Sequence, residues 1–566
     1  MKNTVTVLAL AAALAACQQG GKPLEQPSCR EAGGSATVAR PQFLMNLSVG
    51  ITGWFSSPIA WDLDGDGMKE IIGPFYEIGV WDTDGTELQV VSNEQYHTGR
   101  VYAPAVFADL ENDTIMELVV AAGEGSVAAY EWRAGSFSIK AGWPATTCIE
   151  GSCFENRSLG ADDLDGDGTI EVIVSSTRSE KPPGYVDTNP HVFVFEPGGA
   201  VRDGWPRYDT RTGVGRDLPG GPDSNCYGHS GYGSYGLNVG SGNIDDDPEK
   251  EILVTYDNHH IQAFNPDGTT LLADPSYFTR RGEDCEGSPM SWGQFIRYLD
   301  PVIEDNHYHL HQGDWPGPSW TMWLQWTDSP PGVADLNGDG RNEVIGIPNA
   351  EQDEPYHTYH FAFMVLEGDY EAGGHRSARR LPGWEVLPLS EEPLYNDDWY
   401  PPGGVPSPTL ANIRGDSKPE IIATISDGYA YAFDSNAKML WRYDYTMNRA
   451  LMYASEAAVA DLSGDGRPEI IFGTYGDYIG DGYLIILGSN GEEIHRIQLE
   501  GQEEDGNGIG VAACPTVTDI DGDGALEILV LTIDHGLDVY RVPGSSDNCI
   551  EWGTGRGNYL RNGRYE

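Results

Sequence analysis

The sequence predicts an all-β fold, and three observations support this prediction. First, 72 Gly and 36 Pro in 566 residues interrupt the chain every few residues and leave little room for long helices. Second, a nonapeptide of the form Asp-x-Asp-x-Asp-Gly-x-x-Glu recurs along the chain. Third, a short strand pattern precedes each copy and an apolar strand pattern follows it, as in residues 515–519 and 528–533.

The nonapeptide recurs about eight times, and we name its copies acidic loops 1 to 8. Loops 1, 3 and 8 are nearly ideal, loops 5 and 7 are close variants, and loops 2, 4 and 6 are looser. In chain order the loops are residues 62–70, 109–117, 163–171, 243–251, 335–343, 412–420, 461–469 and 519–527. Their starts are 47 to 92 residues apart, and the shortest intervals match one four-stranded blade. The sequence therefore predicts a β-propeller of about eight four-stranded blades, with seven as the alternative, and with loop insertions around blades 3 to 5.

Each repeat supplies the strands of one blade. The acidic loop joins the first two strands, an aromatic alternation such as residues 429–433 gives the third, and residues 439–443 show the fourth after a turn. The last repeat supplies only about three strands, ending at residues 537–542. We expect residues 42–48 to add the missing strand and to close the ring. The tail, residues 552–565, has aromatic residues suited to wedging at this seam.

The N-terminus resembles a bacterial lipoprotein signal. A short basic start is followed by an apolar stretch, residues 5–16, that is too short to span a bilayer. The stretch ends in Leu-Ala-Ala-Cys17, which resembles a lipobox and makes Cys17 the lipidated residue; the alternative is an ordinary cleavage site with an incidental Cys. We expect a signal peptide at 1–17, a linker at 18–38 and a single propeller domain at 39–566. By the resemblance, Gln18 implies the outer membrane or cell surface of a Gram-negative bacterium, with the lipid as the only membrane anchor.

The chain is strongly acidic, with 87 Asp and Glu against 34 Lys and Arg and a net charge of −53. This balance argues against nucleic-acid binding through basic patches, because the phosphate backbone would be repelled. The acidity favours bound cations, although part of it also serves solubility.

The spacing within the acidic loops has a chemical reason. Oxygens at positions 1, 3 and 5 converge on one point, a backbone carbonyl at position 7 adds a ligand, and the carboxylate at position 9 closes the shell. Calcium takes about six to eight hard oxygens, and magnesium fits less well because it demands stricter octahedral geometry. Gly at position 6 permits the sharp turn. An EF-hand would need flanking helices, whereas strands flank these loops. The sequence therefore predicts several bound calcium ions.

The acidic loops resemble the FG-GAP (VCBS) repeats of integrin α-chain propellers and of many bacterial surface proteins, over roughly residues 40 to 566. The resemblance implies ligands at positions 1, 3, 5, 7 and 9, with position 7 contributing its carbonyl. The implied ligands are Asp62, Asp64, Asp66, Met68 and Glu70 in loop 1; Asp163, Asp165, Asp167, Thr169 and Glu171 in loop 3; Asp335, Asn337, Asp339, Arg341 and Glu343 in loop 5; Asp461, Ser463, Asp465, Arg467 and Glu469 in loop 7; and Asp519, Asp521, Asp523, Ala525 and Glu527 in loop 8.

The other copies are expected to bind less well or not at all. Loops 5 and 7 carry Asn337 or Ser463 at position 3, which keeps an oxygen but removes a charge. Loop 2 lacks the Gly, and loop 4 has Pro248 at the turn. Loop 6 has Arg414 where an oxygen belongs, and this guanidinium is expected to take the place of the ion.

Eight Cys include Cys17, so seven remain and one must be unpaired. Outside the cytoplasm these residues can form disulfides. Three pairings are considered from the spacing: Cys148 with Cys153, Cys226 with Cys285, and Cys514 with Cys549.

A candidate ligand face lies in the insertions that flank loop 4. Residues 213–242 are rich in Gly, Ser and Tyr, and residues 276–331 are rich in Trp and His. The candidate residues are Trp292, His307, His309, His311, Trp315, Trp320, Trp323 and Trp326. Aromatic rings suit the C–H faces of sugars, which favours a glycan-binding surface. The alternating histidines suggest a transition-metal site as one alternative, and histidines packed among Trp without metal as another.

Three classes of function remain open. We prefer a calcium-rigidified binding or adhesion module for a glycan or an envelope protein. The second class is an enzyme of the rhamnogalacturonan lyase type, because eight-bladed calcium propellers occur among those enzymes. No residues specific to that chemistry are recognised, so no catalytic residue is assigned and an enzyme is the less favoured class. The third is a structural envelope protein.

Overall fold

The computed structural model describes residues 37–565, except for residues 93–94, 150, 152, 178–190, 207–236, 257–259, 273–291, 294–322, 327–328, 354–355, 371–377, 395–406, 449–450, 477–481 and 500–509. The expected signal peptide, including Cys17, and all but the end of the expected linker lie outside the described residues. No helix in the described part of the chain is long and apolar enough to cross a membrane.

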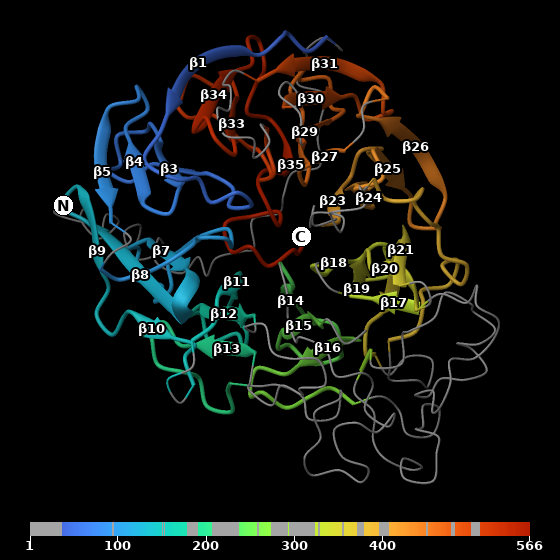
Figure 1. Cartoon of the computed structure of the whole chain (residues 1–566), viewed down its shortest axis with the longest axis horizontal. Helices are drawn as coiled ribbons and strands as arrows, with labels where there is room; N and C mark the ends of the chain where they lie inside the picture. The colour runs from blue at the N-terminus through green and yellow to red at the C-terminus, as the bar shows by residue number, and fades with distance from the viewer. Residues whose placement is uncertain are drawn as a thin grey trace, which may run out of the picture.

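The described strands form eight small antiparallel sheets that radiate from a common axis, as Figure 1 shows. Each sheet is one blade, and the blades follow one another around the ring in chain order. The prediction of an all-β propeller with eight blades is therefore confirmed. One further small sheet accompanies blade 5.

The strands have the same order in every blade, from the axis outward. The innermost strands are β2 (Ile59–Trp61), β6 (Val106–Ala108), β11 (Asn156–Asp162), β14 (Val239–Gly242), β18 (Gly332–Ala334), β23 (Thr409–Ala411), β28 (Ala458–Ala460) and β32 (Thr516–Thr518). The second strands are β3 (Glu70–Pro74), β7 (Glu117–Ala121), β12 (Glu171–Ser176), β15 (Glu251–Tyr256), β19 (Glu343–Gly346), β24 (Glu420–Thr424), β29 (Glu469–Gly476) and β33 (Glu527–Leu531). The third strands are β4 (Ile78–Trp81), β8 (Ser126–Arg133), β13 (Val192–Phe195), β16 (His260–Phe264), β22 (Met364–Glu367), β25 (Tyr429–Phe433), β30 (Tyr483–Leu487) and β34 (Leu537–Arg541).

The outer strands are less uniform. Those long enough to be strands are β5 (Glu87–Val91), β9 (Ser136–Ile139), β26 (Met439–Asp444), β31 (Glu493–Gln498) and β1 (Gln42–Leu47). In blades 3, 4 and 5 the fourth position is reduced to single bridges, Phe195 to Val201, Phe264 to Thr270 and Leu366 to Arg380. In blade 3 the chain soon reaches Pro206, which has no N–H to extend a ladder. The remaining elements are β10 (Ala145–Thr146), β17 (Trp323–Gln325), β20 (Asn349–Asp353), β21 (Tyr356–Phe361), β27 (Met452–Ala454), β35 (Ile550–Trp552) and the 3-10 turn η1 (Gly123–Gly125).

The ring closes as the strand count predicted. Strand β1, from the start of the domain, pairs antiparallel with β34 near its end, so blade 8 contains both ends of the propeller. Asn46 lies opposite Asp538, and its amide donates to that carboxylate at 2.8 Å. The pairing of β1 with β34 removes the unpaired strand edges that two free ends would leave.

The hydrophobic core is a ring of clusters between neighbouring blades. Ile72 of blade 1 packs in one cluster with Phe107 and Leu118 of blade 2, and each of these side chains is at most 2% exposed. Similar clusters join each of the other pairs of neighbouring blades. Because each blade buries both faces against neighbours, its second and third strands read as continuous apolar runs.

The tail fills the axis of the ring, where Figure 1 places the C-terminus. Its carbonyl groups accept hydrogen bonds from inner-strand N–H groups of blades 2, 3, 4, 5 and 8. The pairs are Phe107 with Tyr559, Ala161 with Leu560, Ser241 with Asn562, Val333 with Gly563, and Val517 with Gly553, at 2.8–3.1 Å. The Tyr559 hydroxyl reaches Ala60 of blade 1, Glu551 reaches Asn412 of blade 6, and β35 pairs with β28 of blade 7. The tail and strand β35, which leads into it, therefore contact all eight blades.

Two buried arginines hold the tail in place. Arg561 is 0% exposed and donates to the carbonyls of Ser57, Ala105 and Gly555 at 2.9–3.2 Å. Arg556 is 3% exposed and donates to the carbonyls of Val239 and Pro331. Burial lowers the pKa of each guanidinium to about 10. Carbonyls of four separate blades thus accept hydrogen bonds from two side chains of the tail.

The structure confirms one expected disulfide and contradicts another. Cys148 and Cys153 form the expected disulfide, which closes a short loop next to blade 2. The pairing of Cys514 with Cys549 is wrong. Cys514 is a buried free thiol, and Cys549 is disulfide-bonded to a residue outside the described part of the chain. Cys226 and Cys285 also lie outside the described residues.

Candidate metal centres

Every acidic loop joins the inner strand of its blade to the second strand. In all eight blades the second strand begins at the Glu of position 9. The loop itself is not a strand, because Asp and Gly disfavour extended pairing and support turns. Strands alternate in direction within a blade, so all eight loops emerge at one face of the ring, which we name the loop face.

The Glu at position 9 is held in the same way in every loop. Its side chain is at most 5% exposed, and its Oε2 accepts the backbone N–H of the residue at position 2, at 2.6–3.0 Å. This bond satisfies one carboxylate oxygen and fixes the rotamer of the side chain. Oε1 is left to interact with the loop.

The Asp residues shape the loop through its backbone. In loop 1, Asp62 accepts the N–H groups of Gly65 and Gly67 at 2.7 and 3.0 Å, and Asp66 accepts that of Met68 at 2.8 Å. Gly65 and Gly67 have φ values of 81° and 94°, which a side chain would resist. The same contacts recur in loops 5, 7 and 8. The carboxylates are thus preorganised before any ion binds.

Carboxylate oxygens converge in four of the described loops that follow the pattern. In each group, one oxygen from each of three residues lies within 4.8 Å of the others. The groups are Asp62, Asp64 and Asp66 in loop 1; Asp163, Asp165 and Glu171 in loop 3; Asp245, Asp247 and Glu251 in loop 4; and Asp519, Asp521 and Glu527 in loop 8. Three of the four expected side-chain ligands of loops 1, 3 and 8 are therefore brought together, whereas Glu70, Asp167 and Asp523 are not in these groups; loop 4 joins them despite Pro248.

The oxygens of these groups fit a hard divalent cation. Glu251 is 0% exposed, and its Oε1 has no hydrogen-bond partner among the described residues. Asp163 Oδ1 and Glu527 Oε1 likewise make no hydrogen bond within the described part of the chain. Leaving buried charged oxygens unsatisfied is costly, and an ion with oxygen ligands removes that cost. Calcium bound here would supply positive charge that ties the two strands of a blade together.

Burial and mutual repulsion act on the position 9 carboxyls. Removal from water, together with the nearby charges of Asp245 and Asp247, raises the pKa of Glu251 to about 8. Burial similarly raises the pKa of Glu343 and of Glu469 to about 8. In loops 3 and 8 the pKa of Glu171 and of Glu527 rises to about 7, because a nearby arginine offsets part of the burial.

These shifts give a test in the calcium-free protein. The folded protein holds protons on these carboxyls between the ordinary Glu value of about 4.5 and the raised values of about 7 to 8, whereas the unfolded chain does not. Unfolding free energy should therefore increase as pH falls from about 8 to about 5. Saturating calcium should reverse this trend, since the ion needs ionised ligands. Melting curves at several pH values, with and without calcium, measure both slopes. Equal slopes in the two conditions would contradict the assignment.

Loops 5 and 7 are weaker candidate metal sites because of their geometry as well as their charge. Neither contains a group of three converging carboxylates among the described residues. The Asn337 amide donates to Glu343 Oε1 at 2.8 Å and so occupies the oxygen that should face an ion. Ser463 instead donates to Asp461 at 3.3 Å. This agrees with the expectation of weaker binding in these two loops.

Loop 6 contains its own cation. The guanidinium of Arg414 lies 3.1 Å from Asp416 and 3.9 Å from Glu420, and 3.6 Å from Asp434, which directly follows the third strand β25. It therefore stands among the carboxylates of loop 6, as expected from the sequence.

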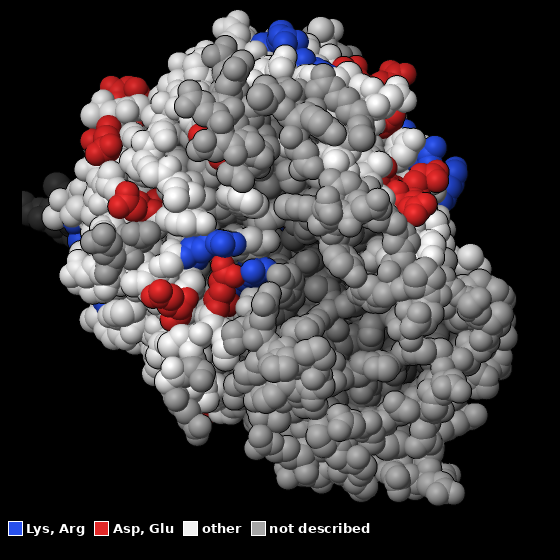
Figure 2. Space-filling view, viewed as in Figure 1, with Lys and Arg blue, Asp and Glu red and all other residues white. Residues whose placement is uncertain are grey.

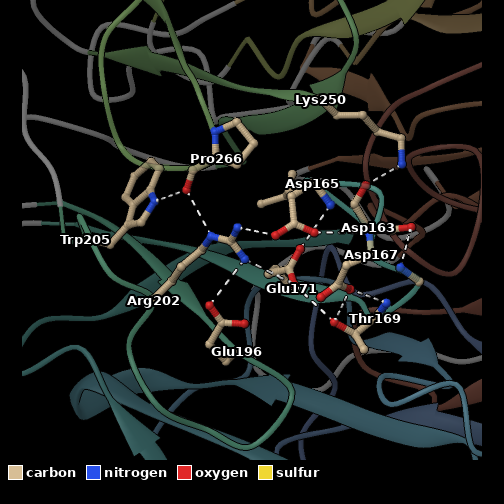
Figure 3. A network of polar contacts seen from close by, with 12 residues as sticks. Asp163, Asp165, Asp167, Thr169, Glu171, Glu196, Arg202, Trp205, Lys250 and Pro266 are labelled. Atoms are coloured by element: carbon tan, nitrogen blue, oxygen red, sulfur yellow. Dashed lines mark hydrogen bonds and ion pairs between the residues drawn. The ribbon is translucent and has the colours of Figure 1, made fainter. Parts of the chain in front are cut away.

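Loop 3 meets an arginine from outside the loop, as Figure 3 shows. Arg202 lies 2.6 Å from Asp165, 3.3 Å from Glu171 and 3.2 Å from Glu196. In loop 8, Arg541 plays a similar role, at 2.8 Å from Asp521 and 3.7 Å from Glu527. Two loops with ideal sequences therefore contact a basic side chain, whereas no described basic residue forms an ion pair with the carboxylates of loop 1.

The structure leaves part of the predicted ligand set as a prediction. The carbonyl groups of Met68, Thr169, Arg341, Arg467 and Ala525 lie at position 7 of well-described loops, where the contact seen is the N–H of that residue to the Asp at position 5. Coordination by these carbonyls stays a prediction.

The candidate ligand face needs correction at two residues. Trp292 and Trp326 are both 0% exposed and pack in the core of blades 4 and 5, beside Leu253, Ile261 and Val344. Their rings are used in packing and offer no face to a sugar, so this part of the prediction is wrong. The backbone of Trp323 lies in β17. The remaining residues, His307, His309, His311, Trp315 and Trp320, lie outside the described residues.

Sequence reasoning missed the bases that contact loops from outside. Lys140 and Arg202 each stand three residues before a Trp, in Lys-Ala-Gly-Trp143 and Arg-Asp-Gly-Trp205. The indole N–H of Trp143 donates to the carbonyl of Pro197, and that of Trp205 donates to the carbonyl of Pro266. This repeated motif was a signal that could have identified the two bases.

Comparisons with known proteins bear on the fold only. No family model matches the chain, and no curated protein matches it. Among solved structures, the chain is similar to the Dos1 propeller (TM-score 0.42, 10% identity, 89% of this chain and 95% of that chain). It is also similar to BamB from Moraxella catarrhalis (TM-score 0.39, 13% identity, 86% and 99%) and to rhamnogalacturonan lyase YesW (TM-score 0.37, 13% identity, 90% and 90%).

The surface of the described residues shows no broad single-sign area on the face seen in Figure 2, where acidic and basic side chains lie next to each other. Arg100 and Arg157, for example, both pair with Glu155 at 3.6 and 2.7 Å.

Proposed function

We propose that this protein is a calcium-binding, lipid-anchored β-propeller of the FG-GAP (VCBS) type that serves as a binding or adhesion module at the bacterial surface. The observation that carries the calcium part is the repeated position 9 Glu. In every blade it begins the second strand, is buried, and directs one oxygen to the loop backbone. Eight repetitions of a costly buried carboxylate favour a shared cation-binding role over solvated turns.

Calcium is favoured over magnesium by the ligand set. The converging loops supply carboxylate oxygens from three residues each and are shaped by backbone N–H bonds to Asp62 and its equivalents. Such a set suits a large ion with flexible coordination, whereas magnesium retains water and needs stricter geometry.

Counting bound ions tests this part. Protein freed of metal and dialysed against calcium should retain about three to five ions per chain, because loops 1, 3, 4 and 8 converge and loops 5 and 7 are weaker. Asp62→Asn should remove one of them. Asp84→Asn, an exposed Asp of a turn outside the loops, is the matched control. Retention of no calcium would overturn the proposal.

The binding role is proposed because the two faces of the ring carry different connections between strands. The acidic loops all emerge at the loop face, so ions stiffen the scaffold there. The connections from the outer strand of one blade to the inner strand of the next emerge at the opposite face, and there binding segments can be presented. A glycan array probed with and without calcium tests this role. Binding lost on chelation supports it, and the absence of any glycan bound, together with no co-purifying envelope protein, would contradict it.

The lipid anchor is tested separately. Expressed with its N-terminus, the protein should incorporate labelled palmitate and partition with membranes, because Cys17 ends a lipobox-like sequence. Cys17→Ser should abolish the label and release the protein. Unchanged labelling in the variant would refute Cys17 as the anchor.

A further inference from the structure

Acidic loop 2 contains a buried protein cation. The ammonium of Lys140 lies 2.8 Å from Glu111, 3.0 Å from Glu117 and 3.1 Å from Glu131. The Lys140 side chain is 2% exposed, and the oxygens of the three Glu residues lie within 4.8 Å of one another. The ammonium thus sits among three carboxylates that would otherwise suit a metal ion.

Lys140 and Arg202 occupy equivalent places in neighbouring blades. Each lies just beyond the third strand, on the chain that returns alongside it. The N–H of Lys140 donates to Ala129 of β8, and that of Arg202 donates to Val194 of β13. Glu131 and Glu196 are also equivalent. The residues after the position 9 Glu, Leu118 and Val172, pair with Tyr130 and Phe195, and Glu131 and Glu196 come directly after these partners. Figure 3 shows the Arg202 side chain directed at loop 3.

The same place is apolar in the next two blades. In blade 4 the N–H of Leu271 donates to Ala263 of β16, and in blade 5 that of Leu381 donates to Val365 of β22. Both Leu side chains are 5% exposed and pack in the hydrophobic core. In loop 4, Glu251 Oε1 makes no hydrogen bond within the described part of the chain.

We propose that the basic residue at this position of blades 2 and 3 neutralises the acidic loop of its own blade in place of a metal ion. Lys140 neutralises loop 2 and excludes calcium from it. Arg202 competes with calcium in loop 3. The inference rests on the proposed calcium binding, and it makes the ideal loop 3 a weaker calcium site than its sequence predicts.

The physical reason is competition for the same oxygens. Calcium in loop 3 needs Asp165 and Glu171, and Arg202 lies within 2.6 and 3.3 Å of them. An ion must displace the guanidinium or share these oxygens with it, at a cost in affinity. The Lys140 ammonium is shielded from solvent and bound by three carboxylates, so displacing it costs more.

The experiment compares Lys140→Leu and Arg202→Leu, each of which installs the residue of blades 4 and 5. Calorimetric titration with calcium alone should show one additional bound ion for Lys140→Leu. It should show one site tightened by roughly threefold or more for Arg202→Leu, as expected when an ion pair no longer competes. Arg442→Leu is the matched control, because Arg442 pairs with Glu391 away from the loops. An unchanged ion count and unchanged affinities would overturn the inference.

Stability separates this inference from the proposed function. In calcium-free buffer Lys140→Leu should melt several degrees below the wild type, and calcium should restore it, because three carboxylates have lost their counter-ion. If Lys140→Leu does not fold, Lys140→Leu with Glu131→Gln, which has one carboxylate fewer, serves in its place. No recovery with calcium in a wild type that binds calcium would overturn this inference alone. A wild type without bound calcium would overturn the proposed function.

Discussion

Deleting residues 553–566 is expected to prevent the protein from folding. The deletion removes the acceptors for inner-strand N–H groups of blades 2, 3, 4, 5 and 8, and with them both buried arginines. Each buried polar group left without a partner costs about 1–3 kcal/mol, and the net stability of a folded protein is only about 5–15 kcal/mol. The truncated chain should lack a cooperative thermal transition and should be digested quickly by protease.

A single substitution in the tail should lower the stability by a smaller, measurable amount. Arg561→Met leaves the carbonyls of Ser57, Ala105 and Gly555 without this donor and should lower the melting temperature by roughly 5 °C or more. Arg442→Met, at an exposed ion pair on an outer strand, is the control and should change stability by less than about 1 kcal/mol. If the truncated chain and the Arg561→Met variant both melt like the wild type, the axial tail does not contribute to the stability of the fold.

Removing calcium is expected to lower the melting temperature by roughly 10 °C or more, because each ion bound only by the folded state adds about 2.7 kcal/mol at a concentration 100-fold above its dissociation constant. The effect should be large because several loops bind ions at once. Calorimetric melting in excess calcium and after chelation measures it, with magnesium as the comparison ion.

The loop responsible can be identified with one pair of variants. Asp519→Asn should reduce the calcium-dependent gain in melting temperature, since Asp519 shapes loop 8 and belongs to its carboxylate group. Asp84→Asn should leave the gain unchanged. An identical melting curve for the wild type with calcium and with chelator would remove the metal from the description of this protein.

Much of the fold could be predicted because its signals are local or countable. The acidic loop places its ligand residues within nine positions, and the strand that follows begins at the Glu in every blade. Ring closure followed from a strand count, since blade 8 lacked an outer strand and residues 42–47 supplied it. These inferences needed only the periodicity of strands and the chemistry of oxygen ligands.

Other features could not be predicted, because they depend on side chains brought together from distant positions. Loop 4 looked poor in sequence, yet its carboxylates converge and Glu251 Oε1 stays unpaired among the described residues. Trp292 and Trp326 looked like a binding surface, yet they fill the space between two blades. An aromatic ring suits a ligand and a core equally well in composition, and only packing distinguishes the two.

The sequence by itself determined the repeated acidic loop and the number of blades, because residues close in the chain carry these features, and it predicted the ring closure through a count of strands. Only the tertiary structure showed which acidic loops contact a basic side chain from outside the loop. In loops 2 and 3 these are Lys140 and Arg202, which follow the third strand of the same blade. The physical reason is that a charge is neutralised by whatever lies within a few ångströms, irrespective of separation along the chain.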